Sequence, residues 1–381
     1  MDWEPHAERL ASEVTEPMSR WRPLVASVPR HLFVPAWWHW TDREGWTACR
    51  GEADERHWVN AAYRDRTLIT RLGPGHADHA RAGDHPSGRP TSSATQPGLV
   101  VAMYRHAGIT GDVDILDIGT GSGYGSALLA RRLGDHHVTS VDVDGYLVEA
   151  AAERLASTGL HPSVSVCDAT GPLPGRYDRI VSMMSVAPVP ASWLAALRTG
   201  GRLVTVLAGT GLLVTADKTA DGGAAGRIEW YRAGFMAARS GPDYPPTLLE
   251  QFPAAREADG EHVTTGRYPV VNIGHAWELS SMLGVTVPGI EHHYEQTGDG
   301  QRTAWLLHPD GSWARAAAAA DGPPVVHQSG PRRLWDVVDD IRHAWLSDGK
   351  LPAYGATIAI TPEGRIQLRR GRWEATIPAP D

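Results

Sequence analysis

The chain has 381 residues, of which 42% are hydrophobic and 21% are charged, and its formal net charge is 36 − 44 = −8. This length predicts two domains or one domain with a large extension, and the composition is too apolar for a disordered chain. The acidic balance argues against nucleic-acid partners. No apolar run is long enough to span a membrane, and two cysteines are too few for a disulfide framework. The start, MDWEPHAERL, lacks the basic and apolar stretches of a signal peptide, so we expect a cytoplasmic location.

Residues 1–35 are predicted to be helical because apolar side chains recur there at helical spacing, with Pro17 and Pro23 as interruptions. Five of the 15 tryptophans come soon afterwards, at Trp37, Trp38, Trp40, Trp46 and Trp58. Trp is large and amphipathic, so this group either lines a binding cleft or packs in a core or cap. General burial trends favour the core.

Residues 73–90 are rich in Gly, Pro, Asp and His and have no apolar period, which predicts a mobile loop. A metal site is the alternative, because the loop contains His76, His79 and His85. Their spacing in a Gly/Asp-rich loop is not that of a closed zinc site. We therefore expect a lid here and no metal.

From about residue 110 the sequence alternates between strand and helix patterns. The expected strands are Val113–Ile118, Val138–Val143, Val164–Cys167, Arg179–Met183 and Arg202–Leu207, and the expected helices are Ser126–Arg132, Tyr146–Ser157 and Ser192–Leu197. Strands separated by helices of this length imply βαβ units and a parallel, doubly wound α/β sheet. Ligands bind such sheets at the carboxyl ends of the strands.

Residues 217–226 are rich in Gly, Ala and Asp and break this alternation. The remaining C-terminal sequence favours strands, with one good helix at Leu334–Leu346 and an Ala run at 316–320 that we expect to be a helix end or linker. We therefore predict three parts. They are an N-terminal substrate-side segment (1–110), a Rossmann-like cofactor-binding core (111–220) and a C-terminal α+β extension (221–381) that recognises a peptide.

The segment DIGTGSGY (117–124) comes after one expected strand and opens a helix. Its glycines allow a tight turn and a close approach to a ligand, and the helix N-terminus offers free N–H groups. The spacing is GxGxG rather than the GxGxxG of dinucleotide folds. Asp117, two positions before the first glycine, would repel a pyrophosphate and suits the cationic end of S-adenosylmethionine. The motif therefore favours a class I methyltransferase fold.

Two further acids lie at the ends of successive strands. Asp142 can accept hydrogen bonds from both ribose hydroxyls, and Asp168 can accept one from the adenine amino group. Three acids at three strand ends argue strongly against an unliganded α/β domain. The expected cofactor-binding set is Asp117, Gly119, Thr120, Gly121, Ser122, Gly123, Tyr124, Asp142, Val143, Asp168 and Ala169.

Seven blocks in order resemble protein-L-isoaspartate O-methyltransferases: VPRHLFVP (28–35), AYRDRTL (62–68), SATQPGLVVAMY (93–104), LDIGTGSGYGSALLA (116–130), VTSVDVD (138–144), YDRIV (177–181) and LRTGGRLV (197–204). The resemblance implies an enzyme that uses S-adenosylmethionine, yielding S-adenosylhomocysteine, to methylate a carboxylate of an aspartate-derived residue. It places Thr95, at the family's usual serine, with Gln96 and Pro97 beside the methyl group. Ser93 is the other candidate catalytic hydroxyl, and we also assign Ser92 and His31 to the substrate side.

An Asp carboxylate has an ordinary pKa near 3.9, so it is already ionised and nucleophilic at neutral pH. Methyl transfer to it needs positioning and exclusion of water rather than a general base. Thr95 or Ser93 would orient one carboxylate oxygen. The alternative for Ser92, Ser93 and Thr95 is a helix N-cap before Pro97, and both roles can hold together.

Relative to the housekeeping enzyme of this family, residues 36–58 and 73–90 look like insertions. About 160 C-terminal residues have no counterpart in that enzyme. The pieces QSGPRRLWDVVDDIRHAW (328–345) and GATIAITPEGRIQL (355–368) are similar to the tails of methyltransferases from ribosomal-peptide pathways, the graspetide group above all. That resemblance implies methylation of an Asp in an acidic, macrocyclic precursor peptide, with loss of methanol to aspartimide or, after hydrolysis, isoaspartate. Repair of isoaspartyl proteins and a non-catalytic peptide-binding module are the alternatives.

Overall fold

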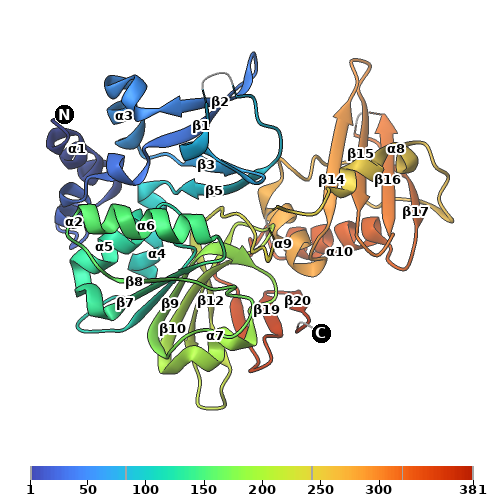
Figure 1. Ribbon diagram of the computed structural model, residues 1–381. Helices are drawn as coiled ribbons and strands as arrows, with labels where there is room; N and C mark the ends of the chain where they lie inside the picture. Colours follow the sequence, from blue (N-terminus) through green and yellow to red (C-terminus); the bar gives the residue numbers. More distant parts are fainter. Residues whose placement is uncertain (1, 82–83, 242, 320, 380–381) are drawn as a thin grey trace.

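The computed structural model describes residues 2–81, 84–241, 243–319 and 321–379, which form three sheets and their helices (Figure 1). The central sheet has ten strands in the order β20-β19-β18-β12-β11-β10-β9-β6-β7-β8. A five-stranded N-terminal sheet lies above it in Figure 1, and a five-stranded C-terminal sheet lies to the right.

The N-terminal part begins with helices, as predicted for residues 1–35. They are α1 (Glu4–Val14), α2 (Arg22–Ser27) and the 3-10 helix η1 (Arg30–Phe33). The N-terminal sheet then comprises β1 (Ala36–Thr41), β2 (Gly45–Arg50), β3 (Leu68–Leu72), β4 (Gly75–His76) and β5 (Pro90–Ala94), with helix α3 (Glu55–Ala62) between β2 and β3. Part of the predicted loop 73–90 is therefore regular, since β4 and the 3-10 helix η3 (Ala77–His79) lie within it.

The parallel half of the central sheet confirms the alternating pattern. Its strands are β6 (Ile115–Ile118), β7 (Val138–Asp142), β8 (Ser163–Val166), β9 (Tyr177–Val186) and β10 (Leu197–Leu207). The helices are α4 (Pro97–His106), α5 (Tyr124–Leu133), α6 (Gly145–Ser157) and α7 (Ala191–Ala196). β6 pairs with β7 on one side and β9 on the other, so the strand order reverses there and opens a crevice at the strands' carboxyl ends.

The C-terminal part contributes to two sheets. Strands β11 (Leu212–Lys218), β12 (Ala224–Arg232), β18 (Thr357–Ile360), β19 (Ile366–Arg370) and β20 (Trp373–Ile377) extend the central sheet by antiparallel pairing. The C-terminal sheet holds β13 (His262–Thr265), β14 (Glu291–Gln296), β15 (Gln301–Leu307), β16 (Trp313–Ala319) and β17 (Val325–Ser329), with α8 (Phe252–Arg256), α9 (Trp277–Thr286) and α10 (Leu334–Ser347). Helix α10 confirms the predicted helix at Leu334–Leu346.

The Ala run is not a helix end or linker. Residues 316–319 belong to β16, and Ala320 lies outside the described residues. Ala316 and Ala318 face the core while the residues between them are more exposed, which is the alternation of a strand. The expected boundary near 220 falls in the turn between β11 and β12, which pair with each other. The three-part division stays a prediction.

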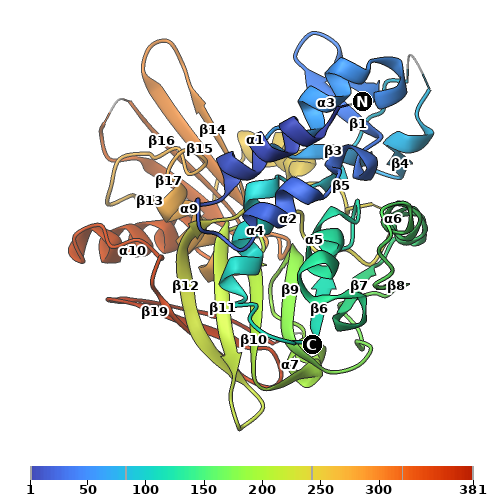
Figure 2. The ribbon, with the colours of Figure 1, turned by 90° about the vertical axis from the view of Figure 1, so that its left-hand side faces the viewer.

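Two apolar cores cover the faces of the central sheet. One contains residues of α1, α2, α4 and α5, and Figure 2 shows α2, α4 and α5 in front of the strands. The other contains residues of α7, α9 and α10 and of the C-terminal sheet. Trp37 and Trp38 are 1% and 5% exposed and pack in apolar clusters of the N-terminal part, so part of the early Trp group forms a core or cap.

Among the described residues, no helix combines the length and the apolar character that a bilayer crossing requires.

Candidate active site

A cleft of about 920 Å³, open to solvent, lies at the carboxyl ends of the parallel strands. Six expected cofactor residues line it: Gly119, Gly121, Asp142, Val143, Asp168 and Ala169. Ser92, Ser93 and Thr95 line it from the side of the N-terminal sheet. The structure therefore brings both candidate hydroxyls and two of the three expected acids to one cavity.

The glycine loop between β6 and α5 adopts a backbone that favours glycine. Gly119, Gly121 and Gly123 have φ values of +93°, +53° and +87°. A Cβ at Gly121 would lie 3.2 Å from the carbonyl oxygen of Ser93, so β5 rests directly on this loop. The close approach explains why the central glycine accepts no side chain here.

Asp142, at the end of β7, is held beside the loop by two backbone N–H groups. The Gly121 N–H donates to Oδ2 at 2.9 Å and the Asp144 N–H donates to Oδ1 at 3.1 Å. Burial raises the pKa of the Asp142 carboxyl, and these two N–H groups counteract part of the rise. The residue also lines the cleft, where a polar ligand would find a fixed acceptor.

Asp168 comes after β8 and closes the other end of the cleft. Its Oδ1 accepts hydrogen bonds from the Thr170 N–H at 2.9 Å and the Thr170 hydroxyl at 2.6 Å. The carbonyl of the neighbouring Ala169 accepts a hydrogen bond of 2.7 Å from the buried indole of Trp193. The turn after β8 is therefore anchored to α7.

Asp117 does not line the cleft, contrary to its expected contact with the cationic end of the cofactor. Its side chain is 1% exposed and lies beneath the glycine loop. Oδ2 accepts hydrogen bonds from Ser126 at 2.9 Å and Ser140 at 3.0 Å, and Oδ1 accepts one of 3.3 Å from Tyr104. A strand-end acid can point into the sheet or out of it, and here the hydroxyls of neighbouring elements hold it inside.

Burial raises the pKa of the Asp117 carboxyl to about 6, although the hydroxyls of Ser126, Ser140 and Tyr104 lower it. The unfolded chain releases this proton near pH 3.8, so the stabilising contribution of the protonated group is lost as the pH rises towards about 6. The loss corresponds to about 3 kcal/mol at 1.4 kcal/mol per pKa unit.

Replacing Asp117 with asparagine should abolish this titration, because an amide does not ionise, and the serine hydroxyls can rotate to accept from the new amide. Denaturant unfolding of ligand-free protein at about pH 3.5 and about pH 7 measures the effect. We expect the variant to gain about 3 kcal/mol relative to wild type between the two pH values. An unchanged difference would show that Asp117 does not carry this burial penalty.

The remaining expected residues of the loop, Thr120, Ser122, Gly123 and Tyr124, also lie outside the cleft lining. Thr120 and Ser140 share a buried hydrogen bond of 2.7 Å between their hydroxyls, so Thr120 supports the turn. Tyr124 begins α5 and is buried against the ring of Phe33. These residues shape the loop from below.

The hydroxyls of Ser92, Ser93 and Thr95 do not cap helix α4. The N-cap residue is Gln96, and Asp65 accepts a hydrogen bond of 2.7 Å from the N–H of Gly98 in the first turn. Pro97 is buried at the first position of the helix. Gln96 and Pro97 lie outside the cleft lining, so they shape the turn that presents Thr95.

His31 also lies outside the cleft and is not placed to touch a substrate there. It is 6% exposed, its Nδ1 is 2.7 Å from the Tyr63 hydroxyl, and its ring packs edge-on against Trp58. Burial lowers the pKa of His31 to about 4, so the ring is neutral at ordinary pH. Its role in the structure is aromatic packing.

A strap formed by residues 233–241 comes after β12 and crosses the cleft, and no sequence pattern predicted it. Gly234, Phe235, Met236, Ala237 and Arg239 of this strap line the cavity. The strap is fixed to β9, because the Ser185 N–H donates to Met236 O and Ser185 O accepts from the Ala238 N–H, both at 2.8 Å. Only the folded sheet brings residues so distant in sequence to the cleft.

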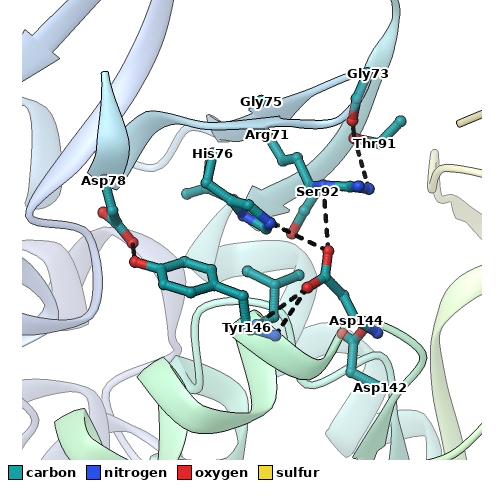
Figure 3. Close-up of polar contacts among 12 residues, drawn as sticks. Arg71, Gly73, Gly75, His76, Asp78, Thr91, Ser92, Asp142, Asp144 and Tyr146 are labelled. Atoms are coloured by element: carbon teal, nitrogen blue, oxygen red, sulfur yellow. Dashed lines mark hydrogen bonds and ion pairs between the residues drawn. The ribbon is translucent and has the colours of Figure 1, made fainter. Parts of the chain in front are cut away.

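Asp144 is also a residue that the sequence patterns did not single out. Its Oδ2 lies 3.2 Å from Arg71 Nε and 3.3 Å from His76 Nε2 (Figure 3). The strap adds a third contact, with Arg239 Nη2 at 3.6 Å from the same oxygen. Its Oδ1 caps α6. Burial raises the pKa of the carboxyl, but the His76 hydrogen bond and the nearby charges hold it at about 2.

The same close-up shows how the first part of residues 73–90 is held on α6. The Tyr146 hydroxyl donates to Asp78 at 3.0 Å, and the rings of His76 and His79 lie 4.4 Å from that of Tyr146. In the described part of the chain, no three His, Cys, Asp or Glu side chains gather as metal ligands. Both histidine rings pack against Tyr146, and His76 also contacts the Asp144 carboxylate.

The sheet order, the glycine loop and the cleft define a class I S-adenosylmethionine-dependent methyltransferase fold. A solved protein-L-isoaspartate O-methyltransferase has the same fold, with a TM-score of 0.50, 15% identity and coverage of 98% of both chains. Residues 81–230 match the sequence model of the protein-L-isoaspartate(D-aspartate) O-methyltransferase (PCMT) family. The likeness of the chain to the PCMT family therefore lies in this segment.

Curated relatives agree with that assignment. The chain is 39% identical over 114 residues to the protein-L-isoaspartate O-methyltransferase of Rhodopseudomonas palustris, covering 29% of this chain and 51% of that protein. It is 31% identical over 183 residues to the enzyme of the same name from Methanoculleus marisnigri, covering 47% of this chain and 65% of that protein. The chain thus spans about half the length of the first of these relatives.

Proposed function

We propose that this protein is an S-adenosylmethionine-dependent O-methyltransferase that methylates an Asp side-chain carboxylate in a ribosomally synthesised, modified peptide. One observation carries the activity. The residues 92–95 that hold the candidate hydroxyls rest on the glycine loop and share a single cleft with Asp142 and Asp168. The match of residues 81–230 to the PCMT family model supports the same chemistry.

The residues of the cleft fit the proposed cofactor. Gly119 and Gly121 line the cleft without side chains, and Asp142 presents fixed oxygens beside them. We assign Asp142 to the ribose hydroxyls and Asp168 to the adenine amino group. When bound, S-adenosylmethionine supplies an electrophilic methyl group on a sulfonium.

The protein itself orients the acceptor carboxylate and excludes water from it. The acceptor carboxylate is ionised at neutral pH, so Thr95 or Ser93 donates a hydrogen bond to one oxygen and leaves the other free to attack. The strap and the N-terminal sheet enclose the cleft from two sides, which limits the access of water. Arg239 places a positive charge on the cleft wall, which favours an anionic acceptor.

The substrate class is argued from the segments outside the cofactor-binding core. The tail blocks at 328–345 and 355–368 resemble methyltransferases of ribosomal-peptide pathways, and the segments 36–58 and 73–90 enlarge the substrate side. Length itself does not distinguish the two substrate classes, because the solved protein-L-isoaspartate O-methyltransferase aligns along 98% of this chain. The names of the curated relatives favour isoaspartyl repair as the second candidate function.

Mass spectrometry of three peptides separates the candidates. They are a macrocyclic acidic precursor, its linear form, and a linear isoaspartyl peptide, each incubated with the protein and S-adenosylmethionine. We expect the macrocycle to gain one methyl group and then lose methanol, and the linear form to stay unchanged. Preferential methylation of the isoaspartyl peptide would assign repair instead. No methylation of any peptide, with S-adenosylhomocysteine still bound, would indicate a non-catalytic binding module.

A further inference from the structure

Arg30 of η1 is a buried cation whose partners are carbonyl oxygens. Its side chain is 0% exposed. It donates to Arg66 O at 3.1 Å, to Ala94 O and Thr95 O at 3.2 Å, to Arg64 O at 3.5 Å, and to Ala62 O at the end of α3. Burial lowers the pKa of the guanidinium to about 10, so it remains charged at neutral pH. Two of these five carbonyls belong to the segment that carries the candidate hydroxyls.

Asp65 holds the next residues of the same segment through their N–H groups. Its Oδ1 accepts from the Gly98 N–H at 2.7 Å, and its Oδ2 accepts from the Gln96 side-chain amide at 2.8 Å. A Cβ at Gly98 would lie 2.8 Å from Asp65 Oδ2, so only glycine permits this approach. The Gln96 N–H donates to Thr67 at 3.1 Å, and Thr67 itself lines the cleft.

We propose that Arg30 and Asp65 form a charged clamp that positions residues 94–98 over the cofactor loop. The cation fixes the carbonyl side of this segment and the anion fixes its N–H side. Both act through Thr95, so they are positioning residues rather than catalytic residues. The inference rests on the proposed methyl transfer at Thr95 and deepens it.

The clamp joins three sequence blocks that are far apart in the chain. Arg30 lies in VPRHLFVP, Asp65 in AYRDRTL, and their targets in SATQPGLVVAMY. A fork-shaped guanidinium can bind several carbonyls at once, which an ammonium cannot do in one plane. Charge-assisted hydrogen bonds are also about twice as strong as neutral ones. The three blocks therefore act together to hold the acceptor side of the cleft.

The test uses the full-length protein with Arg30→Lys and Asp65→Asn. Arg30→Lys keeps the charge and loses the fork. Asp65→Asn keeps the shape and loses the charge. Because a misplacement of about 1 Å can lower a rate about 100-fold, we expect kcat to fall about 100-fold in Arg30→Lys and about tenfold in Asp65→Asn. The Kd for S-adenosylhomocysteine should stay within about threefold of wild type, since neither side chain lines the cleft.

Arg64→Lys is the matched control, because its exposed side chain lies in the same loop and only its backbone carbonyl, which the substitution keeps, approaches Arg30. It should leave kcat unchanged. The methyl acceptor is whichever of the three peptides above the wild-type protein methylates. A second measurement, hydrogen exchange followed by mass spectrometry, should show peptides that contain residues 94–98 exchanging at least about tenfold faster in both clamp variants, with α5 unaffected.

The outcomes separate the clamp from the proposed function. If both variants bind S-adenosylhomocysteine and keep the wild-type kcat, the clamp is refuted and the methyltransferase stands. If the wild-type protein methylates nothing, the proposed function fails and hydrogen exchange alone decides the clamp, with unchanged exchange at 94–98 refuting it. If Arg30→Lys no longer folds, Asp65→Asn decides by the same two readouts.

Discussion

Replacing Asp142 with asparagine is expected to weaken the binding of S-adenosylhomocysteine about 100-fold. Both carboxylate oxygens accept backbone N–H groups, from Gly121 and from Asp144. An amide can offer only one acceptor, so its NH₂ group must face one of these donors and its contact with the ribose weakens as well. The bonds to Gly121 and Asp144 are present in the free protein as well, so the affinity falls through the weakened charge-assisted bonds to the ribose, by about 3 kcal/mol, which calorimetric titration measures directly.

Asp168→Asn is the matched control for this experiment. Asp168 is assigned to a single neutral amino group, and its Oδ1 is already engaged by Thr170. We expect a loss of about tenfold or less in affinity. If Asp142→Asn binds as tightly as wild type while Asp168→Asn does not, the two acids have been assigned to the wrong parts of the cofactor.

Gly123→Ala should lower the free energy of unfolding by about 3 kcal/mol. Gly123 has a φ of +87°, and its added Cβ would lie 3.1 Å from the Cβ of Ala151 in α6. Part of the loss comes from the left-handed backbone, which costs about 1–2 kcal/mol for other residues. The rest comes from overpacking between α5 and α6, and denaturant unfolding reports the sum.

Gly111 separates these two contributions. It also has a positive φ, +68°, but nothing lies within 4 Å of its added Cβ. Gly111→Ala should therefore lose only the backbone contribution, about 1 kcal/mol. Equal losses at the two positions would mean that the contact with Ala151 relaxes without penalty.

The core of the fold was predictable from the sequence because its signals are local. The strand of Ile115–Ile118, the glycines after it and the helix Tyr124–Leu133 are contiguous in the chain. Hydrophobic period, positive-φ glycines and strand-end acids all act over such short distances. The same signals located Asp142 and Asp168 at the cleft.

The orientation of Asp117 and the position of the strap could not be predicted, because they depend on contacts between different segments of the chain. Asp117 has the same strand-end position as Asp142, and only the hydroxyls of Tyr104, Ser126 and Ser140 decide that it points inward. The strap reaches the cleft because β12 lies in the same folded sheet as β6, with β11, β10 and β9 between them. No period or motif in the sequence encodes either arrangement. The prediction for the Ala run was wrong for a different reason, since antiparallel pairing with the neighbouring strands β15 and β17 overrides the local helix propensity of alanine.

The return of β18, β19 and β20 to the central sheet determines when this sheet can be completed. Their side chains, among them Ile358, Leu368 and Ile377, belong to the same apolar core as Leu116 of β6. During synthesis the central sheet is therefore complete only after β20 has been made, and β12 is an exposed edge until β18 pairs with it. A nonsense mutation or a proteolytic cut between β12 and β18 would remove strands from the central sheet itself, although the cleft lies on the other half of that sheet.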